Sequence, residues 1–218
     1  MGKQEETRQR IIEAAFWQIY EHGFQGVGVR EIAQKADLTI GAFFYHFKTK
    51  NDVGYAIIDE YLAAGIHERW IAPLKDFENP IQGMIEIYKK TFDEWPDEFV
   101  SRGCPLNNLG QEMSAIDEKF QAKAARLLAD WIQKTRHYLE IAREKKILKP
   151  ETDTGALAEF IVTLQEATFA MVHGSRCLRV SMAFASSSPS NCSFSGFQRS
   201  FRPSIMAILP MWAIVIVR

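Results

Sequence analysis

The chain has 218 residues, of which 47% are hydrophobic and 24% are charged, and its formal net charge is -1 at pH 7. A chain of this length and composition can bury a sizeable core, which excludes disorder as its default state. The sequence contains no run of about twenty apolar residues, and its first residues lack the apolar region of a secretory signal. We therefore expect a cytoplasmic protein with no membrane partner.

Charge is distributed unevenly along the chain. Residues 1–166 contain 21 Lys and Arg and all 27 Asp and Glu, whereas residues 167–218 contain five Arg and no acidic residue. The near-zero total does not exclude a nucleic-acid partner, because such binding requires only a local basic patch.

The sequence matches no template for a metal site or a catalytic site. The cysteines form no CxxC pair and no Cys/His cluster, so neither a zinc site nor a disulfide framework is indicated. These cysteines are Cys104, Cys177 and Cys192. Four other candidates fit solvated helix faces: His67, Glu68, His137 and Glu140. We expect no metal, no cofactor and no enzymatic activity.

Two helical patterns occupy the first 36 residues. Thr7 can cap a helix whose apolar positions recur every three to four residues, and Gly23 supplies a glycine stop after His22. A second, short helix fits residues 29–36. Asp37 then makes a tight turn, which its tolerance of left-handed backbone allows.

A third short helix is predicted directly after that turn. Thr39 is a good N-cap, and Phe43 and Phe47, four residues apart, can both face a core. The opposite face of this helix carries Ile40, Gly41, Phe44 and Tyr45.

Longer helical patterns follow. Thr49-Lys50-Asn51-Asp52 resembles a capping box that opens a helix running toward Pro73. Asn79 and Pro80 open the next helix, which is rich in aromatic residues until Pro96 stops it.

The remaining patterns before residue 175 are also helical. A helix is predicted over residues 104–113, and Ser114 with Asp117 opens a long one that reaches about residue 146. A last apolar helix fits residues 156–172, before Gly174. No segment before Gly174 alternates with the period of a strand, so we expect an all-α fold.

Residues 175–218 form a different kind of sequence. They include a serine-rich stretch at 186–190 and an apolar run at 205–217 that Pro210 interrupts. No amphipathic period is visible. We expect an atypical tail, either a non-native, out-of-frame ending or a poorly ordered segment.

Residues 28–47 meet the needs of a helix-turn-helix, in which one short helix supports a recognition helix that enters the DNA major groove. Gly41 lets the backbone approach DNA, while Ile40 and Phe44 offer apolar contact to a thymine methyl group. The expected phosphate contacts come from Arg30, Thr39, Tyr45, His46 and Lys50.

The segment Leu38–Lys50, with the sequence LTIGAFFYHFKTK, resembles the signature of the tetracycline-repressor (TetR) family, as does Ile32-Ala33 before it. Three positions depart from the usual pattern. Gly28 stands where threonine often caps the second helix, Asp37 replaces a turn glycine, and Phe44 replaces a frequent tyrosine.

The resemblance implies a homodimeric repressor that a small-molecule inducer or thiol modification releases from a palindromic, double-stranded operator. Residues 1–50 would bind DNA, with recognition helices roughly 34–36 Å apart, and residues 51–174 would form a helical ligand-binding and dimerisation domain. Family members usually pair through their last two helices, of which only one, at about 154–173, is recognisable here.

The sensing residues have two interpretations. Aromatic residues that line an apolar ligand pocket would be Trp70, Tyr88, Phe92, Trp95 and Phe99. The alternative is that they are ordinary packed core. Cys104 lies at the start of a helix, where the amide dipole lowers a thiol pKa and favours reactivity, or it is simply a small buried residue.

Two other functional classes remain as alternatives. An enzyme would need converging titratable groups, which the sequence does not supply. A pure interaction protein would lack the salt-dependent DNA binding that phosphate contacts produce.

Overall fold

The computed structural model describes residues 2–94 and 102–174, and all the regular elements among them are helices. The predicted all-α fold is therefore confirmed. Two compact units are present: a head unit, Met1–Glu68 with Cys104–Trp131, and a body unit, Arg69–Gly103 with Ile132–Arg218. These units do not coincide with the predicted division after residue 50, and the tail predicted at 175–218 lies outside the described residues.

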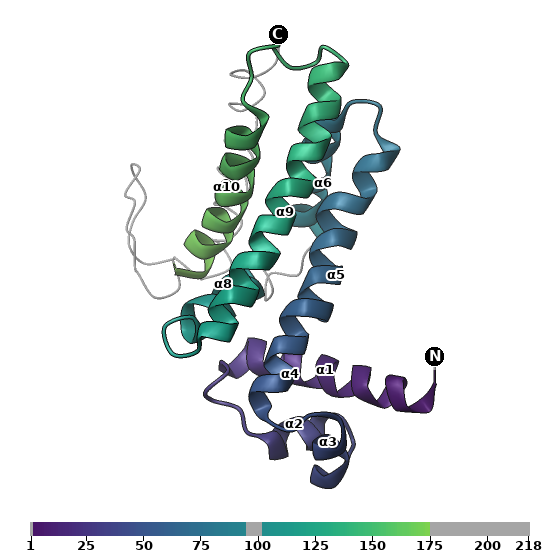
Figure 1. Ribbon diagram of the computed structural model, residues 1–218, viewed down its shortest axis with the longest axis vertical. Helices are drawn as coiled ribbons and strands as arrows, with labels where there is room; N and C mark the ends of the chain where they lie inside the picture. Colours follow the sequence, from purple (N-terminus) through teal and green to yellow (C-terminus); the bar gives the residue numbers. More distant parts are fainter. Residues whose placement is uncertain (1, 95–101, 175–218) are drawn as a thin grey trace, which may run out of the picture. The chain divides into compact units, whose positions relative to one another are not determined.

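The head unit is built from short helices around α1 (Figure 1). Its elements are α1 (Lys3–His22), α2 (Val29–Lys35), α3 (Ile40–His46), α4 (Lys50–Ala56), the π-helical η1 (Ile57–Leu62), α5 (Ala63–Ile66), α8 (Pro105–Met113) and the first part of α9 (Glu118–Glu144). The helices α8 and α9 belong here because Leu109, Met113 and Phe120 share one apolar core with α1–α4. The sequence alone does not predict this packing, because α8 and α9 are far from α1–α4 along the chain.

The first helix begins earlier than predicted. The helix α1 starts at Lys3, and the Thr7 hydroxyl donates to the Lys3 carbonyl at 2.9 Å, so the prediction that Thr7 caps the helix is wrong. A threonine inside a helix commonly makes this bond to the preceding turn. The predicted stop is confirmed, because Gly23 has φ 79° and its N–H donates to the Ile19 carbonyl at 2.8 Å.

The turn between α2 and α3 forms as the sequence predicts. Asp37 has φ 54°, in the left-handed region. Thr39 caps α3, since its Oγ1 accepts from the Ala42 N–H at 3.1 Å. Phe43 and Phe47 are buried on the inner side of α3. Helix α3 therefore has a defined inner face and a free outer face.

Gly54 is required where α4 crosses the core of the head unit. The rings of Phe24 and Phe120 meet edge to face with centroids 5.0 Å apart. A Cβ on Gly54 would lie 2.5 Å from the Phe120 Cζ and 2.7 Å from the Phe24 Cε2. Only a glycine lets α4 approach this ring pair.

The body unit contains η2 (His67–Ile71, from Arg69 on), η3 (Ala72–Asp76), α6 (Pro80–Glu94), the rest of α9 and α10 (Thr154–Gly174). Asn79 caps α6 as predicted, because its Oδ1 accepts from the N–H groups of Ile81 and Gln82 at 3.0 and 3.2 Å. Ile81 packs with Leu139 and Ile161 in the core of this unit.

The N-cap of α9 differs from the predicted one. Ser114 ends α8 and does not open α9. Instead the Asp117 Oδ1 accepts from the N–H groups of Lys119 and Phe120 at 2.9 and 3.1 Å. Helix α9 stops at Glu144, before the predicted end, and Lys146 has φ 59°. Helix α10 spans Thr154–Gly174, close to the predicted last helix at about 154–173.

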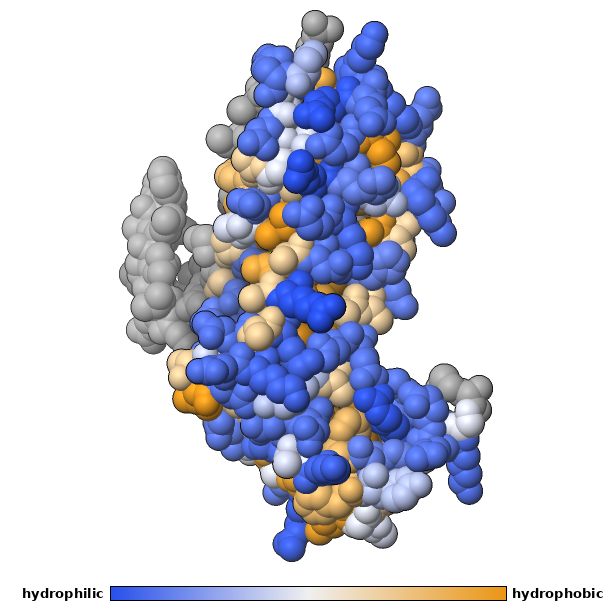
Figure 2. Space-filling view, viewed as in Figure 1, coloured by the Kyte–Doolittle hydropathy of each residue, from blue (hydrophilic) through white to orange (hydrophobic). Residues whose placement is uncertain are grey.

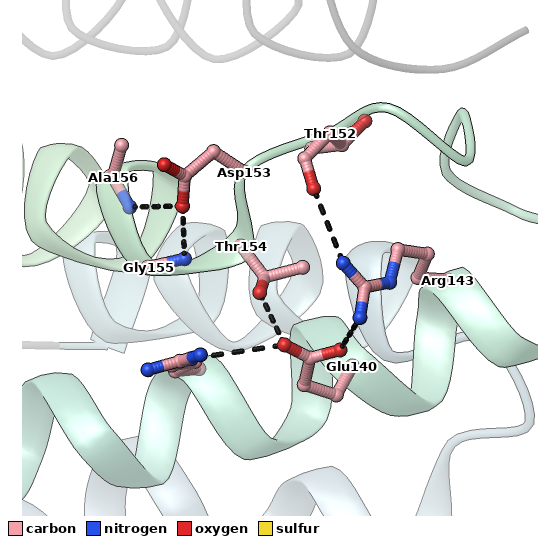
Figure 3. Close-up of polar contacts among 8 residues, drawn as sticks. Glu140, Arg143, Thr152, Asp153, Thr154, Gly155 and Ala156 are labelled. Atoms are coloured by element: carbon pink, nitrogen blue, oxygen red, sulfur yellow. Dashed lines mark hydrogen bonds and ion pairs between the residues drawn. The ribbon is translucent and has the colours of Figure 1, made fainter.

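A polar cluster joins the end of α9 to the start of α10 (Figure 3). Glu140 accepts from the Thr154 hydroxyl and from Arg143, while the Asp153 Oδ1 caps α10 through Gly155 and Ala156 at 2.9 and 3.0 Å. The Thr154 hydrogen bond, with Arg143 and Arg136 nearby, lowers the pKa of Glu140. Glu140, expected on a solvated helix face, is partly exposed and in addition holds this junction.

Candidate nucleic-acid interface

The outer face of α3 exposes large apolar side chains. Ile40 is 41% exposed, Phe44 50% and Tyr45 72%. Figure 2 shows the corresponding hydrophobic surface over α2 and α3, within a largely hydrophilic surround. Burial of such groups stabilises folded chains, so their exposure on one short helix requires a reason outside the head unit.

Gly41 lies on the same exposed helix and is not required by packing. A Cβ added there would meet only the Thr39 Oγ1, at 3.8 Å, which is ordinary van der Waals distance. Glycine inside a helix costs about 0.5–1 kcal/mol relative to alanine. Nothing in the head unit offsets that cost, so this glycine is suited to a close approach from outside.

The polar candidates surround this face. Arg30 is exposed on α2, and the partly buried His46 at the end of α3 has its ring centroid 5.1 Å from that of Tyr45. The Tyr45 hydroxyl accepts from the Gln4 Nε2 at 3.3 Å. Sequence reasoning missed Gln4 because it started α1 at Thr7, which left Gln4 outside the predicted helix, although inside the predicted DNA-binding segment 1–50.

Lys50 is oriented differently from the other candidates. Its ammonium donates to the carbonyls of Phe24 and Val27 at 2.8 and 2.9 Å and lies 4.5 Å from the centre of the Phe24 ring. Burial lowers the pKa of this ammonium, an effect that the charge of Glu112 opposes. The ammonium therefore bonds inside the head unit, which leaves the backbone N–H of Lys50, at the amide end of α4, for the expected phosphate contact.

Glu112, on α8, holds the same loop from its other side. Its two carboxylate oxygens accept from the N–H groups of Phe24 and Gln25, both at 2.7 Å. The loop between α1 and α2 is thus held by an anion on its N–H groups and by a cation on its carbonyls. We call this arrangement of Glu112, Lys50 and residues 24–27 the loop clamp. No local signal predicts it, because Glu112 is far from the loop in sequence.

A second acidic residue connects α4 with the start of α9. The Asp117 Oδ2 accepts from the Asn51 Nδ2 at 2.9 Å and from the Tyr55 hydroxyl at 2.7 Å. The Tyr55 hydrogen bond lowers the pKa of Asp117, while burial and that same bond raise the pKa of Tyr55. Asp117 therefore caps α9 and anchors α4 at the same time.

An ion pair links α1 to η1. The Arg8 guanidinium donates to both carboxylate oxygens of Glu60, at 2.5 and 2.6 Å. This bidentate pair lowers the pKa of Glu60. Arg10 also donates to the Ala36 carbonyl at 2.6 Å, at the end of α2. These contacts of Arg8 and Arg10 hold α1 against η1 and the end of α2. They do not involve the outer face of α3.

Comparisons with known proteins identify this arrangement. The family described as bacterial regulatory proteins, tetR family, matches residues 11–54, and the tetracyclin repressor-like C-terminal domain matches residues 81–184. The transcriptional regulator AcuR from Cereibacter sphaeroides is 30% identical over 161 residues, 70% of this chain and 70% of its own. This chain belongs to the TetR family. The C-terminal match ends past residue 175, where the predicted tail starts.

Further proteins are similar to this TetR-family chain in sequence or in structure. The HTH-type transcriptional repressor DhaR from Mycobacterium sp. strain GP1 is 20% identical over 163 residues, 72% of this chain and 77% of its own. A TetR-family regulator from Cytophaga hutchinsonii has a TM-score of 0.78 at 20% identity, covering 100% and 98% of the two chains. Reduced NemR from E. coli has a TM-score of 0.69 at 18% identity, covering 93% and 95%. These two structures share the fold.

The predicted ligand residues of the TetR-family chain are only partly described. Trp70 and Tyr88 are buried together, with ring centroids 6.1 Å apart, and Phe169 lies 6.5 Å from Trp70. Burial raises the pKa of Tyr88 to about 12, so its hydroxyl keeps its proton at neutral pH. The side chain of Phe92, and all of Trp95 and Phe99, lie outside the described residues.

Cys104 occupies the position predicted for it. It is the N-cap residue of α8, is partly buried, and packs against the core of the head unit. Both features agree with either interpretation of this thiol. Among residues 2–94 and 102–174, no group of three or more His, Cys, Asp and Glu is arranged to hold a metal ion. Over the same residues, no helix is both long enough and apolar enough to cross a membrane.

Proposed function

We propose that this TetR-family chain is a ligand-responsive transcriptional repressor that binds a palindromic, double-stranded operator as a homodimer. The observation that carries the proposal is the exposed apolar face of α3, a recognition helix with Gly41 open to the outside. The relative DhaR is named a transcriptional repressor, which favours repression over activation. Residues 1–50 would bind DNA, and residues 51–174 would bind the inducer and pair the subunits.

The proposed contacts follow the two faces of the helix-turn-helix. Ile40, Gly41 and Phe44 would lie nearest the bases in the major groove. Arg30, Thr39, Tyr45 and His46 would contact phosphates. At Lys50, we assign the phosphate contact to its backbone N–H in the first turn of α4, since the ammonium belongs to the loop clamp.

Release from DNA requires that the rest of the chain changes the position of the recognition helix. A small molecule near Trp70 and Tyr88, with Phe92, Trp95 and Phe99 as further candidates, is one proposed signal. Modification of Cys104 is another, because this thiol begins α8 and Glu112 of the same helix holds the α1–α2 loop. The loop clamp and Asp117 connect α8 and α9 to the DNA-binding helices, which supports a mechanical route for either signal.

The test is binding of the purified full chain to duplex DNA from upstream of its own gene, with scrambled duplex of equal length as control. The expected result is selective binding that weakens steeply as salt rises, because phosphate contacts release counterions. A folded dimer that shows no selectivity at low or high salt would contradict the proposal. Thiol alkylation or a ligand screen then uses the same assay, with loss of binding as the readout.

A further inference from the structure

The recognition helix lacks the side chains that usually read bases by hydrogen bonding. Its seven residues are Ile40, Gly41, Ala42, Phe43, Phe44, Tyr45 and His46. Bidentate reading of guanine uses Arg or Lys, and bidentate reading of adenine uses Asn or Gln. Helix α3 contains none of these four types, and its polar residues Tyr45 and His46 are already assigned to phosphate contacts.

The outward side chains of α3 have a different chemistry. Among the described residues, five large hydrophobic side chains are exposed, and three of them, Ile40, Phe44 and Tyr45, lie on this one helix. Ile40 and Phe44 are four residues apart, so they stand on the same face, one turn above the other. Gly41 beside them leaves the backbone accessible.

We infer that α3 reads thymine methyl groups, so the operator half-site carries A·T pairs where Ile40 and Phe44 face the major groove. The inference rests on the proposed function and adds the chemistry of its DNA partner. The C5-methyl group of thymine is the apolar feature that a base edge presents in the major groove, and aliphatic or aromatic side chains contact it. Because two apolar residues stand one turn apart, each half-site contains at least one such thymine.

The methyl group can be removed without changing any hydrogen-bonding group of the base pair. Deoxyuridine differs from thymidine only by this methyl, so a thymine-to-uracil replacement isolates the apolar contact. The operator is first selected from a random duplex pool with the purified full chain, and each thymine of the best duplex is then replaced singly. At the positions read by α3, we expect about fourfold weaker binding per methyl removed.

Variants connect each sensitive thymine to a side chain. Phe44→Ala should remove the uracil effect at one position of the half-site, and Ile40→Ala should remove it at a neighbouring position. The matched control is Ile116→Ala, which deletes an exposed apolar side chain of the head unit that is not part of α3; it should leave every uracil effect unchanged. Circular dichroism checks that all three variants remain helical.

Salt separates this readout from the phosphate contacts. Total affinity should fall steeply with salt, whereas the ratio between thymine and uracil duplexes should stay constant, since an apolar contact releases no counterions. Selective binding with no uracil-sensitive thymine would overturn the inference and leave the proposed function standing. A uracil effect that persists in both Phe44→Ala and Ile40→Ala would also overturn it. Failure of the folded dimer to bind any duplex would overturn both.

Discussion

The chain uses aromatic residues in two regions with opposite exposure. On α3, Phe44 is 50% exposed and Tyr45 is 72% exposed. In the body unit, Trp70, Tyr88 and Phe169 are 8%, 4% and 3% exposed. Packing alone accounts for the buried set, because aromatic rings supply large apolar area to a core. Packing does not explain the exposed rings of α3, so these rings are the stronger indication of a binding surface.

Truncation of a buried ring gives the largest expected effect. Trp70→Ala should lower the free energy of unfolding by about 3–5 kcal/mol, through lost transfer energy and the cavity left behind. Phe44→Ala, the matched exposed variant, should change it by about 0.5 kcal/mol or less. Urea denaturation of both proteins measures the difference. Equal losses would erase the distinction between the two regions.

Removal of the loop clamp should have the next largest effect. Glu112→Ala leaves the N–H groups of Phe24 and Gln25 without their carboxylate and leaves Lys50 without its nearby anion, so we expect a loss of about 2 kcal/mol. The control is Gln111→Ala, the exposed neighbour on α8. Hydrogen exchange at the two amides should rise in Glu112→Ala alone. Unchanged exchange there would show that the clamp does not hold the loop in solution.

Comparison of the predicted with the observed elements shows which features of the fold the sequence determines locally. Short-range signals predicted the elements that depend on local chemistry, such as the Thr39 cap, the left-handed Asp37 and the Asn79 cap. The wrong N-cap predictions arose where more than one nearby side chain or hydrogen bond was available. Thr7 bonds back to its own helix, and Asp117, a stronger acceptor than Ser114, caps α9.

The interface was predicted where it depends on one helix and missed where it depends on distant ones. Ile40 and Phe44 were placed outward by helical periodicity, and the structure exposes both. The inward turn of Lys50 could not be predicted, because its partners are loop carbonyls whose position α8 fixes through Glu112. The same limit applies to Glu60, which meets Arg8 only in the folded chain.

The pH dependence of stability tests the Arg8–Glu60 ion pair of the head unit, with a smaller expected effect. Arg8 lowers the pKa of Glu60 in the folded protein, so the unfolded chain takes up that proton at a higher pH. The stability from this pair is therefore full above the carboxyl's ordinary pKa of 4.5 and is lost as pH falls below it. We expect a contribution of about 1 kcal/mol, since the pair is partly exposed.

Urea titrations between pH 7 and pH 3 measure this contribution. Glu60→Gln should be less stable than the parent at pH 7, and the gap should close toward pH 3. Glu13→Gln, at an exposed position of α1, serves as the control and should follow the parent at every pH. A gap that stays constant with pH would mean that the Arg8–Glu60 pair contributes packing and not charge.

Gly41→Ala gives the smallest expected change in stability. It also contrasts the exposed face of α3 with the packed core of the head unit. The variant should be more stable by about 0.5–1 kcal/mol, because the Cβ has open space and alanine favours the helix. Its DNA binding should nevertheless fall by roughly tenfold, since the same Cβ stands where a base edge would approach. At Gly54, by contrast, Gly54→Ala should destabilise the protein, because that Cβ meets two rings. If α3 contacts DNA at Gly41, Gly41→Ala should raise the free energy of unfolding and lower the affinity for DNA. A variant that gains stability and keeps full affinity would show that Gly41 is not part of the interface.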